Sequence, residues 1–200
     1  MVMTAPQMPQ GERILAPAGT IQAVCYDVWD LGWQKTEWQG KEKLLPKIII
    51  AFELKELIAD GKRAGERYGI SRRYTFSFHE KANLGKDLEA WLNVKITKEE
   101  RKGFDVETLI GKNCFLSIIH TEKDGKTYSN ISSVMPIMKG MEEMTPMNPR
   151  GIPEWVQKVQ AKALDEQDVS LWLEQQAQLK AEANEPELEK KVVTDEEIPF

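Results

Sequence analysis

One run of β-branched and aromatic residues stands out near the start of the chain: Gly19-Thr-Ile-Gln-Ala-Val-Cys-Tyr-Asp-Val-Trp-Asp30. Side chains of these types favour extended backbone, so the run predicts a long first strand. Residues 46–54 have a similar composition, with three consecutive isoleucines before Phe52, and predict a second strand. The polar residues 31–45 between them are expected to form a connecting loop.

Three more strands are expected further along the chain. Residues 72–78 alternate between two sets of side chains, as a half-buried strand does. Residues 113–121 and 127–136 have the composition of strands and are separated by the dipeptide Asp124-Gly125. This dipeptide supplies the positive φ angles of a tight hairpin, so the last two strands should be direct neighbours.

A helical insertion is expected between the third and fourth strands. Residues 83–91 place Leu84, Leu88 and Trp91 on one stripe, and Thr97-Lys-Glu-Glu100 has the spacing of a capping box. Five strands with a helix between the third and fourth follow the order of the OB-fold, a Greek-key barrel. We therefore predict a mainly β protein on a five-stranded OB-fold. A β-sandwich is the alternative, but it would need more strands.

The remaining segments are expected to be appended to this barrel. Residues 1–17 form a flexible arm, and residues 18–140 form the barrel domain. Residues 141–180 are a Met- and Pro-rich connector followed by helices, and residues 181–200 are acidic and nearly free of apolar residues. Such a composition predicts a disordered tail.

Charge is divided unevenly along the chain. Residues 1–140 hold 21 Lys and Arg against 18 Asp and Glu, whereas residues 141–200 hold 6 against 14. A mildly basic body with an acidic tail fits a domain that binds a polyanion and carries a separate recruiting arm. No apolar run is long enough to span a membrane, and the N-terminus does not have the pattern of a signal peptide. Cys25 and Cys114 are expected to be buried thiols of a cytoplasmic protein.

Binding of single strands without sequence preference needs aromatic faces for the bases and cations for the phosphates. An OB-fold uses the loops between its first two and its last two strands for nucleic acid. The first of these loops holds two tryptophans and three lysines, namely Trp33, Lys35, Trp38, Lys41 and Lys43. We expect DNA contacts there. The alternative that Trp33 and Trp38 fold back as a lid on the barrel stays open.

The last loop and the third strand supply the other candidate DNA contacts. They are Lys123, Lys126 and Tyr128 around the hairpin turn, and Arg72, Arg73, Tyr74 and Lys81 on or just after the third strand. One face of a barrel strand points into the core, so the aromatic row containing Tyr74 can pack inside instead of stacking on bases.

The chain ends on three carboxylates followed by two apolar residues around a proline: Asp195-Glu196-Glu197-Ile198-Pro199-Phe200. A frayed acidic terminus is the ordinary interpretation of such an end. The six residues, however, resemble the acidic tip of bacterial single-stranded DNA-binding proteins, which typically ends in Asp-Asp-Asp-Ile-Pro-Phe. The resemblance implies that replication or repair proteins bind this tip, with Phe200 in an apolar pocket and its carboxylate on a basic rim.

The middle of the chain carries a second resemblance, over about residues 18–140. It rests on Tyr74-Thr-Phe-Ser-Phe-His-Glu-Lys81, Leu88-Glu-Ala-Trp91, Gly103-Phe-Asp105, Leu109-Ile-Gly-Lys-Asn-Cys114 and Gly125-Lys-Thr-Tyr128. This order is similar to a family of small phage-encoded proteins near replication genes, often called single-stranded DNA-binding or replication proteins. The resemblance implies an OB-fold and a phage or prophage origin, hence a bacterial cytoplasm. It implies no residue roles.

These observations predict a non-enzymatic protein that coats single-stranded DNA in replication and recombination and recruits partners through its tip. Two alternatives remain: a nuclease on the same barrel, and a decoy that uses the tip to occupy host proteins. No cofactor or metal is expected, because His79, His120 and the two cysteines do not have zinc-finger spacing. The sequence leaves open whether the protein is a homo-oligomer.

Overall fold

The computed structural model describes residues 14–79, 82–147 and 151–183. These residues fall into two compact units, divided between Ala163 and Leu164. The first unit holds the sheet and most of the helices, and the second holds the helix α4 (Glu166–Ala183). The prediction of a mainly β protein is confirmed. No helix among the described residues is both long and apolar enough to cross a membrane.

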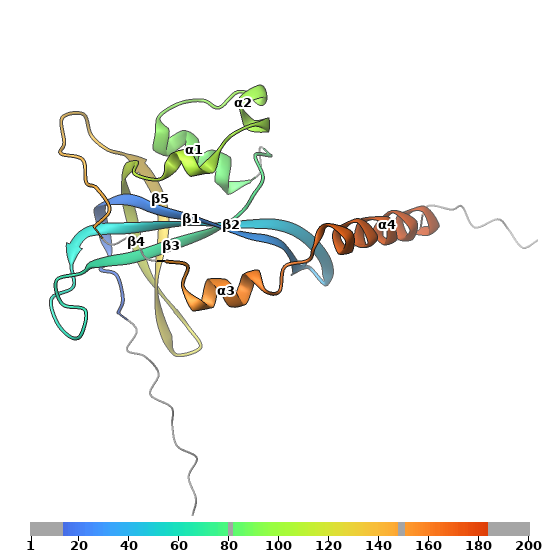
Figure 1. The fold of residues 1–200 in the computed structure, drawn as a ribbon, viewed down its shortest axis with the longest axis horizontal. Helices are drawn as coiled ribbons and strands as arrows, with labels where there is room; N and C mark the ends of the chain where they lie inside the picture. The colour runs from blue at the N-terminus through green and yellow to red at the C-terminus, as the bar shows by residue number, and fades with distance from the viewer. Residues whose placement is uncertain (1–13, 80–81, 148–150, 184–200) are drawn as a thin grey trace, which may run out of the picture. The chain divides into compact units, whose positions relative to one another are not determined.

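The five strands form one antiparallel sheet (Figure 1). They are β1 (Gly19–Trp38), β2 (Lys41–Leu57), β3 (Arg67–Thr75), β4 (Asn113–Lys123) and β5 (Lys126–Pro136). Their order is β3-β2-β1-β4-β5, so that β1 pairs with β2 on one side and with β4 on the other. The Arg72 guanidinium of β3 reaches the carbonyl of Ser132 in β5 at 3.4 Å. The two ends of the sheet therefore approach each other, which is consistent with a barrel-like fold.

Strand β1 pairs with both β2 and β4, and it bends along its length. Its register with β2 shifts between Cys25 and Asp27 and again between Asp30 and Gly32. Bulges of this kind bend a strand and increase its twist. At the first shift the Asp27 carboxylate accepts hydrogen bonds from the Val28 N–H at 2.8 Å and the Trp29 indole at 2.6 Å, which fixes the bend.

The expected loop over residues 31–45 is wrong. These residues continue β1 and β2 as a long hairpin, paired without interruption from Trp33 opposite Pro46 to Trp38 opposite Lys41. The connection is only Gln39 and Gly40, with φ angles of 52° and 71°. Two consecutive positive φ angles match the twist of a two-residue hairpin turn. We refer to this extension of the sheet, residues 33–46, as the arm.

The sheet buries side chains on both of its faces. The larger core contains Phe52, Leu116 and Ile118 and is covered by α1 (Asn83–Leu92), which inserts Leu84, Leu88 and Trp91 as the sequence predicted. Cys25 and Cys114 lie in this core with no exposed surface, so the prediction of buried thiols is confirmed. The smaller core lies on the other face, under α3 (Glu154–Gln160), and contains Trp29, Leu31, Ile49, Ala51 and Val156.

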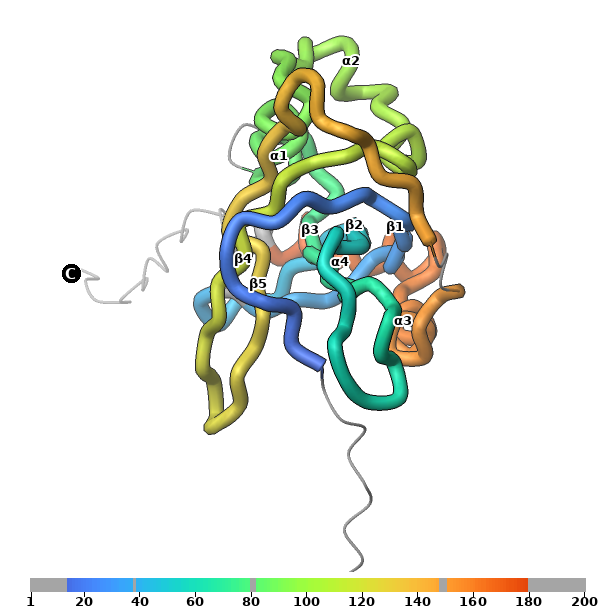
Figure 2. The backbone as a smooth tube through the Cα atoms, turned by 90° about the vertical axis from the view of Figure 1, so that its left-hand side faces the viewer, coloured from blue at the N-terminus to red at the C-terminus, as the bar shows by residue number. Residues whose placement is uncertain are grey.

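The remaining helical segments are short. Helix α2 (Lys98–Lys102) begins at the predicted capping box, in which Thr97 and Glu100 exchange hydrogen bonds. A 3-10 turn follows over Val106–Leu109. Figures 1 and 2 show α1 and α2 on one side of the sheet and α3 on the other.

Residues 141–147 lead from β5 towards α3 and are fastened by buried or half-buried polar side chains. The Gln22 amide donates to the carbonyl of residue 142 at 2.7 Å. Asn113 bonds both the N–H and the carbonyl of Met144 at 2.8 Å. Glu53, fully buried in β2, accepts from the N–H of residue 147 at 2.9 Å. Met144 of this connector is itself buried.

Candidate nucleic-acid interface

The face of β2 and β3 opposite the larger core carries the candidate site. Strand alternation puts Ile49 and Ala51 of β2 on this face, since both pack in the smaller core. Their partners across the ladder are Arg73 and Ser71 of β3, which therefore share the face. We call this surface the outer face.

A groove of about 950 Å³ lies at one end of the outer face, between β3, β5, α3 and the chain just before β1. Its walls come from residues 14–16, 69–71, 128–130, Arg63, Glu66, Tyr26, Trp29, Pro153 and Trp155. Figures 1 and 2 show that the β2–β3 loop and the β4–β5 hairpin, which both contribute to its walls, project to the same side of the sheet, away from α1 and α2. The carbonyl of Ala16 is bonded to His120 and Ser129 at 2.8 Å, which holds the N-terminal wall against the hairpin.

Aromatic side chains dominate the α3 side of the groove. Trp29 stands edge-on to Tyr26, with ring centroids 6.0 Å apart, and edge-on to Trp155, at 6.2 Å. Tyr26 and Trp29 are almost fully buried, whereas Trp155 is 46% exposed. Tyr128 lines the groove from β5 and is half-buried. The groove thus presents two accessible rings: Trp155, which packs edge-on against the buried Trp29, and Tyr128.

Helix α3 is docked by a few specific contacts. Val156 is fully buried in the smaller core. The Gln34 amide donates to the carbonyl of Val159 at 3.2 Å, and the Gln160 amide donates to the carbonyl of Asp30 at 2.7 Å. These contacts fix the position of Trp155, because it is the immediate neighbour of the buried Val156.

Gly32 allows the chain after α3 to approach the sheet. Its φ of +66° is in the left-handed region, and a Cβ built there would lie 2.8 Å from the Cβ of Ala163. Only glycine satisfies both conditions without strain. The bulge in β1 and the docking of α3 therefore depend on the same residue.

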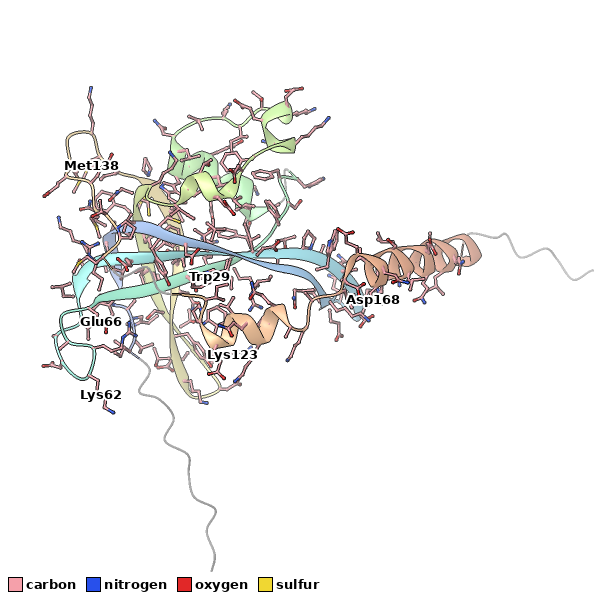
Figure 3. All side chains as sticks on the ribbon, in the orientation of Figure 1. Trp29, Lys62, Glu66, Lys123, Met138 and Asp168 are labelled. Carbon is pink, nitrogen blue, oxygen red and sulfur yellow. The ribbon has the colours of Figure 1, made fainter. Side chains whose placement is uncertain are left out.

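The charges near the groove are mixed. Arg63 and Glu66 of the β2–β3 loop both line it and form an ion pair at 2.8 Å. Figure 3 shows Lys62 on the β2–β3 loop and Lys123 towards the end of the β4–β5 hairpin, with Trp29 between the sheet and α3. Cations thus stand on both projections that border the groove, which suits a ligand with a charged backbone and flat bases.

The predicted DNA contacts on the arm lie on two opposite faces of the sheet. Trp33 and Lys35 lie on the face that continues the larger core, because their partners Pro46 and Leu44 alternate with the outer-face positions. Lys41 and Lys43 belong to the opposite face, which is the outer one. The lysines at 35, 41 and 43 are exposed and Trp33 is half-buried. The side chain of Trp38 lies outside the described part of the structure.

Tyr74 belongs to the larger core and does not offer its ring to a base. It is 4% exposed, and its hydroxyl donates to Asp87 of α1 at 2.8 Å. Burial, followed by the nearby Asp87 carboxylate, raises the pKa of Tyr74. Arg72 lies over this ring, 5.2 Å from its centroid, and forms an ion pair with Asp87 at 3.0 Å. Tyr74 is thus engaged in the core, and the half-buried Arg72 is engaged with Asp87 beside it.

The other predicted residues are divided among three places. Arg73 is exposed on the outer face, two residues along β3 from Ser71 in the groove wall. Lys123 and Lys126 are exposed and directly opposite each other at the hairpin end. Lys81 and the tip from Asp195 to Phe200 lie outside the described residues. Among the predicted aromatic contacts whose side chains the structure describes, only Tyr128 lines the groove.

A second group of rings lies on the larger-core side. Phe76 and Phe78 are 6.3 Å apart, and Phe78 and Phe104 are 5.5 Å apart. Phe76 is 37% exposed, and its N–H donates to the carbonyl of Pro46 opposite Trp33. None of these three rings lines the groove described above, so they form a separate candidate stacking surface on the opposite side of the sheet.

A scan against protein-family models and a search of curated proteins each find no match for this chain.

Sequence reasoning missed the aromatic residues of the groove other than Tyr128. In the sequence, Tyr26 and Trp29 belong to the expected first strand, and Trp155 falls in the helices expected within residues 141–180. A signal was present in Pro153-Glu-Trp155, since a tryptophan in the first turn of a short helix is hard to bury completely. Its partner surface lies more than a hundred residues earlier in the chain, so the pattern could not locate it.

Proposed function

We propose that the outer face of β2 and β3 binds single-stranded DNA without sequence preference. The observation that carries the proposal is the groove, in which Trp155 and Tyr128 are accessible and the ring of Trp155 packs edge-on against the buried Trp29. Stacking on an aromatic ring contributes about 1–3 kcal/mol per base and tolerates any sequence. Two such rings supply most of the affinity that a short single strand needs.

The position of the groove supports the same proposal. An OB-fold binds oligonucleotides on the face of its second and third strands, between the loop after the first strand and the loop after the fourth. The strand order β3-β2-β1-β4-β5, with a helix between β3 and β4, is the order expected for that fold. The groove lies beside β3 and the β4–β5 hairpin, where such a ligand would run.

In this proposal the protein coats and protects single strands during phage replication or recombination. Recruitment of replication and repair proteins is assigned to residues 195–200, and this part rests on the sequence of the tip alone. Cytoplasmic location in a bacterial host belongs to the same proposal.

The experiment is fluorescence anisotropy of a labelled oligo-dT with Trp155→Ala and Tyr128→Ala. Each substitution should weaken binding by about 1–3 kcal/mol, or roughly five- to 150-fold. Phe76→Ala is the matched control, because it removes a comparably exposed ring from the opposite side of the sheet. Equal affinities for the three variants and the wild type would refute a stacking role for the groove.

A further inference from the structure

Two cations stand side by side on the outer face, beyond the groove. Lys47 of β2 pairs with Thr75 of β3, and Ile49 pairs with Arg73. Alternation puts all four on the outer face, so Lys47 and Arg73 are diagonal neighbours across the two strands. The Lys47 ammonium donates to the Thr75 hydroxyl at 2.7 Å, which fixes its position.

These two charges repel each other without a carboxylate between them. Among the described residues neither Lys47 nor Arg73 forms an ion pair within 4.0 Å, whereas Arg63, Arg67, Arg72 and Arg101 each form one. Burial, and then the charge of Arg73, lower the pKa of Lys47. Like charges held together at a cost to the free protein are typical of a site that awaits an anion.

The pair is aligned with the groove. Ser71 lines the groove wall, and Arg73 is the next residue of β3 on the same face. Consecutive residues on one face of a strand are about 7 Å apart. An anion bound at Lys47 and Arg73 would thus adjoin a group held in the groove.

We propose that Lys47 and Arg73, with the Thr75 hydroxyl, bind a backbone phosphate of the single strand whose bases stack in the groove. This inference deepens the proposed function and rests on it. Arginine offers a planar fork of N–H donors that matches two phosphate oxygens, and lysine adds a point charge. The half-buried position of Lys47 makes its charge less screened than that of a lysine on the arm.

The test measures the salt dependence of binding for Lys47→Gln and Arg73→Gln. For single strands the slope of log K against log salt falls by about 0.7 for each phosphate contact that is lost. Because both cations contact one phosphate, we expect each variant to lose slope, up to about that much, and to bind several-fold more weakly at low salt. Lys139→Gln removes an exposed charge from outside the outer face and is the control, with an unchanged slope. Lys47→Arg keeps the charge and should retain the wild-type slope.

Two ligands separate this inference from the proposed function. Oligo-dT carries bases and phosphates, whereas an oligonucleotide of abasic sites carries only the sugar–phosphate backbone. The Lys47 and Arg73 variants should weaken binding of both, while Trp155→Ala should weaken binding of oligo-dT alone. Inorganic phosphate at millimolar concentration should not compete with either oligonucleotide. Competition by free phosphate would identify a site for the phosphate ion instead and would overturn the inference.

The two failures are distinct. If the wild type binds neither oligonucleotide at low salt, the proposed function and the phosphate site fall together. If it binds oligo-dT through Trp155 but Lys47→Gln and Arg73→Gln keep the slope of Lys139→Gln, only the phosphate site is wrong. Circular dichroism and urea unfolding of each variant establish that the fold is intact.

Discussion

Replacing Gly32 by alanine should release α3 from the sheet and weaken DNA binding together. Alanine at a φ of +66° costs about 1–2 kcal/mol, because its Cβ approaches the following carbonyl oxygen. The new Cβ would also lie 2.8 Å from the Cβ of Ala163, and overpacking of this kind typically costs about 1–3 kcal/mol. The total penalty of about 2–5 kcal/mol falls on the contact between β1 and the chain that follows α3.

Gly40 supplies a matched control within the same pair of strands. Its φ is +71°, but no atom lies within 4 Å of the position of an added Cβ. Gly40→Ala therefore carries the backbone cost without the steric one. The difference between Gly32→Ala and Gly40→Ala measures the close approach of Ala163. Adding Ala163→Gly to Gly32→Ala should recover the stability lost to the steric clash, but not the stability lost to the backbone strain.

Hydrogen exchange is the assay for α3 itself. In Gly32→Ala the amide protons of Gln157 and Ala161, which donate to carbonyls of their own helical turns, should lose protection. Because Trp155 would leave the groove with α3, the affinity for oligo-dT should fall towards that of Trp155→Ala. The docking described for α3 would be refuted if Gly32→Ala matched Gly40→Ala in stability, in exchange and in affinity.

Three further predictions concern stability. Asn113→Ala leaves the buried N–H and carbonyl of Met144 without their partner and should cost about 2–4 kcal/mol in urea unfolding, while Asn130→Ala, which removes an exposed amide, should cost under about 1 kcal/mol. Thr97→Ala removes the capping box and should cost about 1 kcal/mol, seen as faster exchange at the N–H of Glu100; full retention of that protection would contradict the cap. Burial raises the pKa of the Cys25 thiol to about 12 and that of Cys114 well above 9.0, so a thiol reagent at pH 8 should modify them only after unfolding. Since the unfolded thiols ionise near 9.0 and the folded ones do not, the free energy of unfolding should decrease as the pH rises from 9 towards 12, and Cys25→Ser should reduce that decrease.

The strands could be predicted because the residues that they bury are apolar, and this is visible in their composition. Phe52 and its isoleucine neighbours pack on both faces of β2, and the sequence there is continuously apolar. The hairpin at Asp124-Gly125 and the capping box at Thr97 could be predicted because each depends only on residues within a few positions. The turn has the expected positive φ angles of 52° and 70°.

The arm could not be predicted because few of its side chains are buried in a core. Its residues are mostly polar and mostly exposed, so the period-2 pattern of a half-buried strand is absent. Its turn, Gln39-Gly40, also differs from the Asn-Gly and Asp-Gly pairs that identify two-residue hairpins. Once the arm is paired, alternation decides which predicted contacts share a face, and this separates Trp33 from Lys41 and Lys43.

The candidate site depends on contacts that are distant in sequence. Tyr128 was found because it lies next to a predicted hairpin, but Trp155 joins it only after α3 docks on β1 and β2. The sequence could not decide between core packing and base stacking for Tyr74, nor show the ion pair of Arg72, since their partner Asp87 lies on α1 across the larger core. Lys47 was overlooked because its neighbour Arg73 comes from another strand.

Photo-cross-linking tests the central claim most directly. An oligo-dT carrying 5-iodouracil, irradiated with the full chain, should attach to rings on which its bases stack, and mass spectrometry of the peptides identifies them. We predict adducts on Trp155 and Tyr128, which are lost when unlabelled oligo-dT competes. Adducts confined to Trp33 and Phe76, on the opposite side of the sheet, would contradict the assignment of the groove as the single-strand site.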